Sequence, residues 1–531
     1  MIDLLIIGSG GAALSAALSA TQNGKSVVVL SKTYPTASQT SQAQGGINGV
    51  IGSDDTVQNH ISDTIRSAHG LGDQKSIEFM CKNGSDTIAW LDDMGVAFSR
   101  DQDNNIAQRK LGGATNARAC YSSDYTGLKI LHTLYDRALK ENIEFLNEKI
   151  ALNIIVEDET AVGLTYLDIK NSEVKTIKAK NIVIATGGYS GIYHNYTTNS
   201  TATTGDGVAL ALKAGCKLAN MEYIQFHPTS IKGTGVLVSE SARAEGGYLV
   251  TKNGDRFIDE LKPRDEVARA IYQKIQDGQS VYLDLRHLGY EKIKEAMPQE
   301  YELVLQFASK YLDKDLIEIE PAAHYTMGGI KTDMAGQTNI KNLYAVGEVA
   351  SNGVHGANRL GGNSLLEIIT FGKYIGDIAT YSTNNITNID TLLEIAKIKE
   401  EENIKKLFHS SIKLDFYEKR DNLGETFFKN VGLFRDEKKL NIALKHIEQL
   451  QDDIQYMGVE DKSAIYNTNL KEFIEFKNML EISKSIILSA LYRKESRGAH
   501  YRVDFQDEKE NYSFDTVSYK IDDDIKIENQ N

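Results

Sequence analysis

Residues 2–13 read IDLLIIGSGGAA, an apolar run of strand length followed by a glycine-rich turn. Gly8 permits the tight turn, and Gly10 lets the backbone approach a pyrophosphate closely. The small residues at 11–13 let a following helix pack against the strand with its N-terminus facing the phosphates. This order of strand, turn and helix predicts a dinucleotide-binding β-α-β unit.

Two departures from the usual fingerprint lie in the same unit. Ala13 stands in the place of the third glycine, and Ser31 and Lys32 follow the second strand where an acidic residue is usual. Residues 25–30 are that second strand, an apolar run after a helix that is expected to end near Thr21. Strands that are apolar throughout are covered on both faces, so we expect an α/β architecture.

Two later apolar runs are expected to return to the nucleotide. Residues 181–188 (NIVIATGG) are typical of a buried strand that ends in a turn, and residues 345–348 (AVGE) end a similar run. The glutamate of the second run, Glu348, suits a contact with a ribose or ribityl chain.

Composition limits the possible functions. The chain has 531 residues and a net charge of −14, so we expect several domains and no nucleic-acid partner. Its three cysteines lack CxxC spacing, which excludes a disulfide framework and a four-cysteine metal or iron–sulfur site within the chain. We expect a cytoplasmic protein without a bound metal. No stretch is apolar enough to span a membrane.

The pattern changes twice along the chain. Between about 230 and 320 a mixed pattern interrupts the apolar strands, which indicates an inserted domain. Residues 392–407 and 438–451 show helical periodicity with Lys and Glu outward, so the region from about 386 to 494 is expected to form a helical bundle. Residues 506–531 are polar and acidic and are expected to be partly disordered.

A set of basic side chains falls in short turns far apart in the sequence. The segments are QFHPT (225–229), SESAR (239–243), KPRD (262–265), HYTMGG (324–329) and HGANR (355–359). Together they bring arginine, histidine and one glutamate into turns marked by glycine or proline. Guanidinium and imidazole groups bind carboxylates through charge-assisted hydrogen bonds, so the set suits a small dianion.

Along nearly its whole length the chain resembles the flavoprotein subunit family of succinate dehydrogenase and fumarate reductase, whose close relatives include L-aspartate oxidase. The motifs that carry the resemblance, besides those five segments, are Ser31-Lys32, AQGGI (43–47), ATGG (185–188), TGDG (204–207), PRDEVAR (263–269), NSLLE (363–367) and ESRGAH (495–500). The resemblance implies a Rossmann-like FAD-binding domain with an inserted α+β capping domain and a C-terminal helical domain. The expected ranges are 1–229 and 323–385 for the FAD-binding domain, 230–322 for the capping domain, 386–494 for the helical domain and 495–531 for a tail segment.

The family's roles carry over onto matching positions. The positions that match FAD contacts are Gly8, Gly10, Gly11, Ser31, Lys32, Gln44, Gly45, Gly46, Asp206, Glu348 and Ser364. Those that match contacts to the substrate, a C4 dicarboxylate, are His227, Ser239, His324, Arg359 and Leu111. Arg264 matches the group that transfers the proton, and Glu240 and Arg243 match its proton relay.

The relay also makes chemical sense from the residues alone. Glu240 and Arg243 are three apart, so on a helical turn they face the same way. Arginine is a poor acid because it is nearly always protonated. It can transfer a proton when neighbouring charges assist and a carboxylate restores the proton, which favours an Arg–Glu–Arg chain over three unrelated surface charges.

Two departures from the family pattern bear on chemistry. Many respiratory members attach FAD to a histidine in a Ser-His-Thr context, whereas this chain has Gln39 between Ser38 and Thr40. An amide cannot form that bond, so we expect non-covalent FAD. The absence of a covalent link favours fumarate reduction, or an electron donor or acceptor outside the common type. Aspartate oxidases carry a glutamate that holds the substrate's amino group, and here Leu111 takes that position.

The leading interpretation is therefore a succinate/fumarate oxidoreductase flavoprotein, for which the resemblance implies an iron–sulfur partner and membrane-anchor subunits. These would hold it at the inner face of the cytoplasmic membrane. L-aspartate oxidase in NAD biosynthesis is the alternative, favoured by the short chain after His500 and by the expected non-covalent FAD, which the soluble and aspartate-oxidising relatives share. A catalytically idle flavin-binding scaffold is a third reading, which the intact Arg264, Glu240 and Arg243 set opposes. Cys120, near the Leu111 loop, is expected to be a buried small residue.

Overall fold

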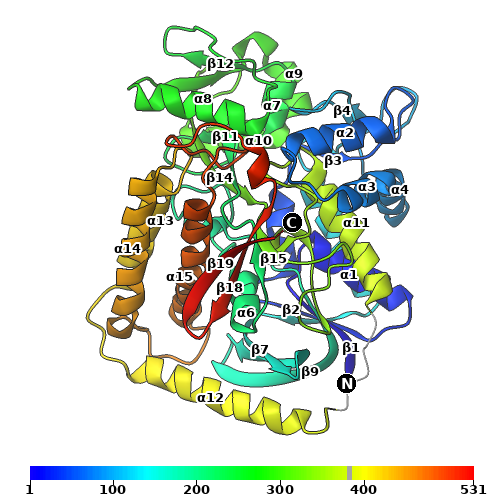
Figure 1. Ribbon diagram of the computed structural model, residues 1–531. Helices are drawn as coiled ribbons and strands as arrows, with labels where there is room; N and C mark the ends of the chain where they lie inside the picture. Colours follow the sequence, from blue (N-terminus) through cyan, green and yellow to red (C-terminus); the bar gives the residue numbers. More distant parts are fainter. Residues whose placement is uncertain (380–385, 531) are drawn as a thin grey trace.

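The computed structural model describes residues 1–379 and 386–530 (Figure 1). Its main sheet carries, in spatial order, β6 (Glu144–Asn147), β2 (Val27–Ser31), β1 (Ile2–Ile7), β9 (Glu173–Ile184), β8 (Thr160–Asp168) and β7 (Lys149–Glu157), and β16 (Leu343–Ala345) also pairs with β9. The pairs among β6, β2, β1, β9 and β16 are parallel. Their carboxyl ends therefore meet at one edge, where doubly wound sheets bind ligands.

Helices α1 (Gly11–Gln22), α11 (Asn363–Ile378) and α5 (Thr126–Lys140) share one core with alternate residues of the sheet. Helices α1 and α11 approach closely because α11 carries glycine at the contact: a Cβ on Gly372 would lie 2.6 Å from the backbone oxygen of Ala12. This packing fixes the starts of both helices at the same edge of the sheet.

Segments within 224–326 form the upper part of the molecule in Figure 1. Its sheet has the order β11 (Ile224–Ile231), β14 (Ile317–Thr326), β13 (Val281–Asp284) and β12 (Tyr248–Thr251). Its helices are α7 (Glu240–Ala244), α8 (Arg264–Gln276), α9 (Tyr290–Ala296) and α10 (Pro298–Ala308). The segment has a separate hydrophobic core, whose buried members lie between Ile231 and Ile319, as an inserted capping domain requires.

The helices expected after 386 are α12 (Ile389–His409), α13 (Phe416–Asn430), α14 (Glu437–Asp453) and α15 (Thr468–Tyr492). Only α13, α14 and α15 pack as a bundle. Helix α12 instead lies across β8 and β9 at the base of the molecule (Figure 1), so its expected place in the bundle was wrong. The amphipathic pattern indicated a buried face but not which element would cover it. The predicted boundary at 385 lies outside the described residues.

The C-terminal tail is ordered, contrary to the expected partial disorder. Strands β18 (Asp515–Ile521) and β19 (Asp524–Gln530) form a hairpin that extends a sheet of order β17 (Ala350–Ser351), β15 (Gly329–Lys331), β10 (Leu218–Ala219), β18 and β19. Val517 and Ser518 are buried there, while acidic residues stay outside. The high polarity of the segment concealed a half-buried hairpin.

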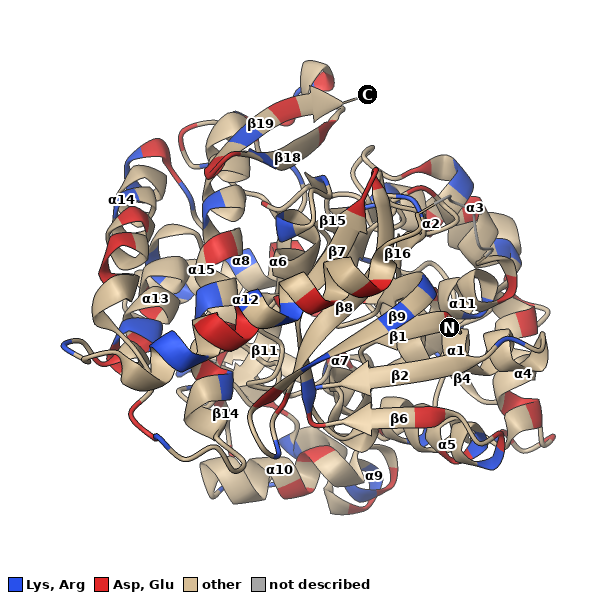
Figure 2. Ribbon diagram, turned by 90° about the horizontal axis from the view of Figure 1, so that it is seen from below, with Lys and Arg blue, Asp and Glu red and all other residues tan. Residues whose placement is uncertain are grey.

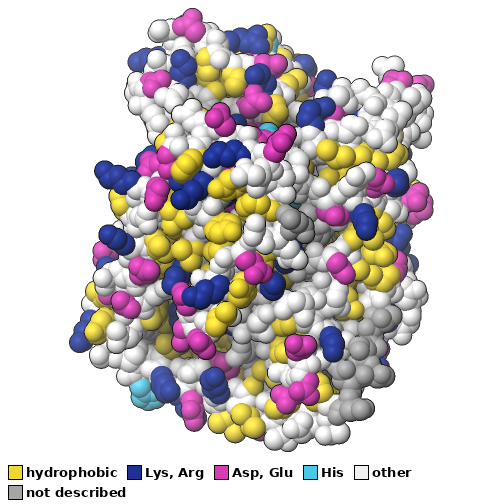
Figure 3. Space-filling view, viewed as in Figure 1, with side chains coloured by type: hydrophobic (Ala, Val, Ile, Leu, Met, Phe, Trp, Pro, Cys, Tyr) yellow, Lys and Arg dark blue, Asp and Glu magenta, His cyan; other side chains and the backbone are white. Residues whose placement is uncertain are grey.

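The remaining N-terminal elements form the flank beside α11: α2 (Val57–Ser67), α3 (Gln74–Lys82), α4 (Gly84–Met94) and the short sheet of β3 (Ile47–Asn48), β5 (Ala119–Cys120) and β4 (Gln108–Arg109). Figure 2 shows acidic and basic residues interspersed along the outer helices, and Figure 3 shows side chains of both charges mixed over one face of the molecule. Among the described residues, no helix is both long and apolar enough to cross a membrane.

Candidate active site

One cavity opens where the parallel strands end and the capping segment folds over them, and it encloses about 1670 Å³ including its mouth. All the predicted cofactor and substrate positions line it, together with Arg264 and Glu240. Arg243 is the exception, because it lies buried behind the wall. The structure thus brings residues from 8 to 364 in the sequence into a single site.

The N-terminal turn forms a cradle that fits a pyrophosphate. Gly8 has φ +113°, and a Cβ there would lie 2.1 Å from the backbone oxygen of Ala185. Gly10 caps α1 without a side-chain hydrogen bond, and the Gly11 amide donates to Thr40 Oγ1 at 3.0 Å. Such a helix start leaves backbone N–H groups for an anionic ligand, as FAD phosphates require.

Lys32 lies at the far end of this cradle and is already paired. Its Nζ is 2.6 Å from Asp206, 2.8 Å from Glu475 on α15 and 2.7 Å from Thr204 Oγ1. Burial would lower the pKa of Lys32, but the two carboxylates outweigh burial and raise it. The ion pairs therefore fix Asp206 at the cavity wall and join α15 to the nucleotide end.

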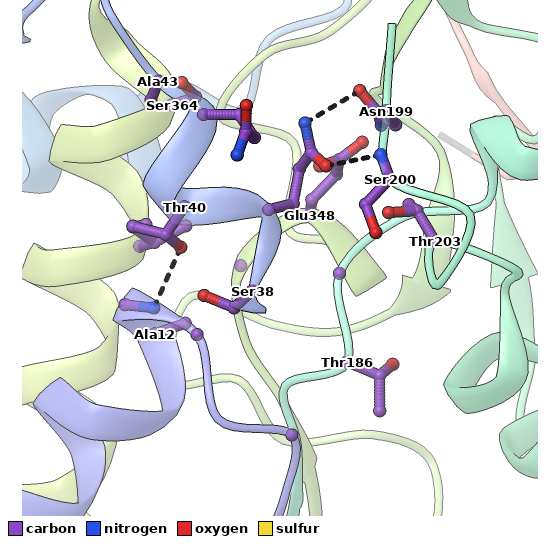
Figure 4. Close-up of a pocket in the computed structure, with 18 of the residues that line it drawn as sticks. Ala12, Ser38, Thr40, Ala43, Thr186, Asn199, Ser200, Thr203, Glu348 and Ser364 are labelled. Carbon is purple, nitrogen blue, oxygen red and sulfur yellow. Dashed lines mark hydrogen bonds between the residues drawn. The ribbon is translucent and has the colours of Figure 1, made fainter. Parts of the chain in front are cut away.

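Glu348 projects into the cavity from the turn after β16 (Figure 4). Its Oε1 accepts hydrogen bonds from the amide of Thr326 at 2.9 Å and from Thr326 Oγ1 at 3.2 Å. Burial raises the pKa of Glu348 to about 7. Its second oxygen suits the hydroxyl donors of a sugar, which bind a carboxylate best when it is ionised.

Gln39 belongs to the short helix η2 (Gln39–Gln42) and connects it to the loop opposite. Its Oε1 accepts from the amide of Ser200 at 2.8 Å, and its Nε2 donates to Asn199 Oδ1 at 3.3 Å. Figure 4 shows Asn199 and Ser200 facing η2 across the cavity. Nearby, the buried Gln44 Oε1 has no partner within the described residues, a feature consistent with a site built for a polar cofactor.

Two buried histidines form one wall of the substrate half. The ring centres of His227 and His324 are 5.0 Å apart. Burial lowers the pKa of both well below the ordinary value, and neighbouring positive charges lower it further. His227 Nδ1 is 3.2 Å from both the amide and the backbone oxygen of Thr229, so this backbone fixes the ring. In the tautomer in which the Thr229 amide donates to Nδ1, Nε2 carries the proton and can donate to a carboxylate.

Arg359 supplies the strongest carboxylate-binding group. Its guanidinium lies 4.2 Å from the centre of the Tyr325 ring, and its Nη2 donates to Gln225 Oε1 at 3.0 Å. Its Nε is buried without a partner within the described residues. Burial, followed by the charge of Arg264, lowers the pKa of Arg359 to about 10. An anion in the cavity would satisfy that unpartnered donor and restore the ordinary pKa.

Arg264 and Glu240 face each other across two helices of the capping segment. Arg264 Nε is 2.7 Å and its Nη2 is 2.5 Å from Glu240 Oε2, while the amide of Gly112 donates to Glu240 Oε1 at 2.5 Å. Burial would raise the pKa of Glu240, but Arg264 and Arg243 outweigh it and hold that pKa below its ordinary value. Arg243 donates to the backbone oxygen of Glu260, and its Nε and Nη2 have no partner within the described residues.

Leu111 lies buried in the same wall, one residue before the amide that contacts Glu240. A Cβ on Gly45 would be 3.7 Å from Leu111 Cδ1, so the side chain closes the space between the two halves. Cys120 is also buried, and burial raises the pKa of its thiol to about 12. Leu111 therefore presents an uncharged surface, and Cys120 is inert packing.

Three contributors were missing from the predicted site. Thr198 bonds His324 Nδ1 at 2.7 Å, Gln225 contacts Arg359 and Arg264, and Glu300 bonds the amide of Ser239 at 3.2 Å. Gln225 stands two residues before His227 on β11, so strand alternation could have placed it on the same face. Thr198 and Glu300 come from segments without a recognisable motif, and only the fold brings them here.

Known protein families match most of this chain. The family model "FAD binding domain" matches residues 3–365, and "Fumarate reductase flavoprotein C-term" matches residues 420–531. The chain belongs to the succinate dehydrogenase/fumarate reductase flavoprotein subunit family. The predicted resemblance and fold class are confirmed, and the family makes this chain an FAD-dependent oxidoreductase.

Individual relatives match nearly the whole length of this flavoprotein. It is 36% identical over 539 residues to the succinate dehydrogenase flavoprotein subunit of Rickettsia bellii, covering 95% of this chain and 90% of that protein. It is 38% identical over 529 residues to the 8-methylmenaquinol:fumarate reductase flavoprotein subunit of Wolinella succinogenes, covering 95% and 86%. A structure of Escherichia coli quinol fumarate reductase FrdA matches with a TM-score of 0.95 at 33% identity, covering 100% and 96%.

Proposed function

We propose that this flavoprotein interconverts succinate and fumarate with non-covalently bound FAD, as the flavoprotein subunit of a larger complex. The observation that carries the proposal is the contact of Arg264 with Glu240 beside a cavity lined by His227, His324 and Arg359. That arrangement offers hydrogen-bond donors for two carboxylates. It also offers one guanidinium group, that of Arg264, whose partner is the carboxylate of Glu240. A C4 dicarboxylate meets both requirements.

The substrate would lie between the two halves of the cavity. Arg359, His227, His324 and the hydroxyl of Ser239 hold its carboxylates, because each presents a donor in a buried setting where electrostatic interactions are strong. Bound FAD would supply the two-electron chemistry by accepting or returning a hydride. Its phosphates fit the turn at Gly8, Gly10 and Gly11, and Glu348 suits a sugar hydroxyl.

Arg264 would move the proton at the substrate carbon that does not exchange hydride. A guanidinium gives up a proton reluctantly, so its partner must restore the proton at once. Glu240 contacts Arg264 directly and interacts electrostatically with Arg243, which in turn reaches the backbone of Glu260. This Arg–Glu–Arg order provides the path by which solvent protons would return to Arg264.

The neutral side chain of Leu111 supports succinate over L-aspartate, because it offers an ammonium group no charge and the neighbouring carboxylate of Glu240 is already engaged by Arg264. The relatives named above act on succinate or fumarate, which does not favour the aspartate oxidase alternative. Gln39 supports non-covalent attachment, since both ends of its amide are engaged and an amide is not a nucleophile. We infer an iron–sulfur partner and membrane-anchor subunits by analogy with the relatives' complexes.

The test is anaerobic mixing of the FAD-loaded protein with succinate and, separately, with L-aspartate, followed by flavin absorbance. We expect succinate to bleach the flavin and fumarate to restore its colour. Bleaching by L-aspartate alone would identify the protein as an L-aspartate oxidase of NAD biosynthesis. It would also show that a neutral residue at position 111 does not exclude L-aspartate. No bleaching with either compound would indicate a flavin-binding scaffold.

A further inference from the structure

A chain of hydroxyl groups connects the substrate half of the cavity to a buried carboxyl group on α10. Ser239 lines the cavity, and its Oγ bonds the Oγ of Ser241. Ser241 Oγ is in turn 3.1 Å from Glu300 Oε1. All three side chains are buried, so the chain is shielded from bulk water. It is separate from the contact between Glu240 and Arg264.

The hydrogen bonds around Glu300 are compatible with a protonated carboxyl group. Its Oε1 also accepts from the amide of Ser239 at 3.2 Å, whereas its Oε2 has no partner within the described residues. The amide of Glu300 donates to Asp124 Oδ2 at 2.9 Å, and Asp124 Oδ1 is similarly unpartnered. Burial, aided by the charge of Asp124, raises the pKa of Glu300 to about 7.

Other titratable groups stand on the elements next to Glu300. Arg109 on β4 interacts electrostatically with both Glu300 and Asp124, Glu240 and Arg243 stand on α7 beside Ser241, His227 stands on β11, and Lys294 on α9 pairs with Glu302. None of these side chains forms a hydrogen bond with Glu300 in the described residues, and Arg109 donates instead to the backbone of Ser123. Ser241 is therefore the side-chain link between Glu300 and the cavity.

The protonation of Glu300 decides the direction of this link. When Glu300 is ionised it only accepts, so Ser241 donates to Glu300 and Ser239 donates to Ser241. Ser239 then turns a lone pair toward the cavity, which repels a carboxylate. When Glu300 carries its proton on Oε1, the oxygen that contacts Ser241, it donates to Ser241, Ser241 donates to Ser239, and the Ser239 hydroxyl hydrogen is free to meet a substrate carboxylate.

We propose that Glu300 is a positioning residue that sets the hydrogen-bond direction of Ser239 and couples dicarboxylate binding to the uptake of one proton. The inference rests on the proposed function, because it assigns the Ser239 hydroxyl to a substrate carboxylate. The proton comes from solvent and stays on the carboxyl group, so no oxidant or further reactant is needed. Binding is tighter below the pKa of Glu300 and weaker above it.

The experiment measures fumarate binding to the oxidised, FAD-loaded protein, with which fumarate cannot react, through the change in flavin absorbance between pH 6 and pH 8. Loss of one charge-assisted hydrogen bond weakens binding by about tenfold, so we expect that change in the wild type as pH rises. Glu300→Gln should bind fumarate with an affinity that no longer changes between pH 6 and pH 8, because its amide does not titrate. Calorimetry in two buffers should show proton uptake in the wild type and less in this variant.

Two further variants guard against a purely structural effect. Ser241→Ala breaks the link while keeping the Glu300 carboxyl group in place, and it should also flatten the pH dependence, even if Glu300→Gln fails to fold. Glu302→Gln, an exposed change on the same helix, should keep the wild-type slope. If fumarate affinity changes with pH in Glu300→Gln or in Ser241→Ala as it does in the wild type, the inference is overturned. Glu348 is unchanged in all these variants, so it cannot account for a difference between them. Absence of fumarate binding in the wild type itself would overturn the proposed function and the inference with it.

Discussion

Replacing Arg264 by alanine separates catalysis from stability. Arg264 holds Glu240 by two contacts, at 2.7 and 2.5 Å, and Glu240 is 2% exposed. In the variant this carboxylate keeps the Gly112 amide and the more distant charge of Arg243. Leaving a buried charge without its direct partner costs about 3–5 kcal/mol of folding free energy. Loss of a positioned acid–base group lowers turnover by roughly 10²–10⁴-fold.

The assay combines chemical unfolding of the FAD-loaded protein with the rate of fumarate-dependent flavin reoxidation. The double variant Arg264→Ala/Glu240→Gln removes the orphaned charge, so it should regain most of the lost stability but none of the turnover. Arg286→Ala is the matched control: it removes an exposed ion pair with Asp284 in the same segment and should cost less than about 1 kcal/mol. Turnover above about 1% of wild type in Arg264→Ala would refute the assignment, because it would lie outside the range for a lost general acid.

Three other changes test the cofactor and substrate contacts. Burial raises the pKa of Glu348 to about 7, and ribose hydroxyls favour its ionised form, so FAD affinity should rise about tenfold from pH 6 to pH 8. A fluorescence titration should show that Glu348→Gln abolishes that rise. Acid precipitation should release all FAD into the supernatant, and flavin retained in the pellet would contradict non-covalent attachment. Gln39→Ala should weaken FAD binding about tenfold, because it removes the two hydrogen bonds that join η2 to the loop opposite. Leu111→Glu should abolish bleaching by succinate because it adds a second buried carboxylate beside Glu240, whereas Leu111→Met should leave bleaching intact, as an absorbance assay can show.

The parts of the fold predicted from sequence were those with a local physical signature. The turn at Gly8 needs a residue without a side chain, and the spacing of Glu240 and Arg243 places both on one helical face. The motifs around His227 and Arg359 pointed to one anion site, and the cavity brings them together. In each case a few adjacent residues carry the constraint.

The parts that escaped prediction depend on partners distant in sequence. The pattern of α12 indicated an apolar face but not that β8 and β9 would cover it. Strand β18 looked like a polar tail because its pairing partner, β10, is far away. Glu300 has no motif, and its importance comes from its contact with Ser241 across the capping segment. Domain limits and the roles of individual site residues stay predictions.

The pairing of β10 with β18 has a consequence for biosynthesis. Leu218 pairs with Ser518, so a strand that lies only a few residues before the substrate-binding β11 waits for a segment made much later. At roughly 5–20 residues per second, the ribosome needs on the order of 15–60 s to supply it. During that interval β10 exposes an unpaired edge, which is a template for wrong association. Docking of β10 is therefore expected only after β18 has been made, and chaperones that shield strand edges should favour it.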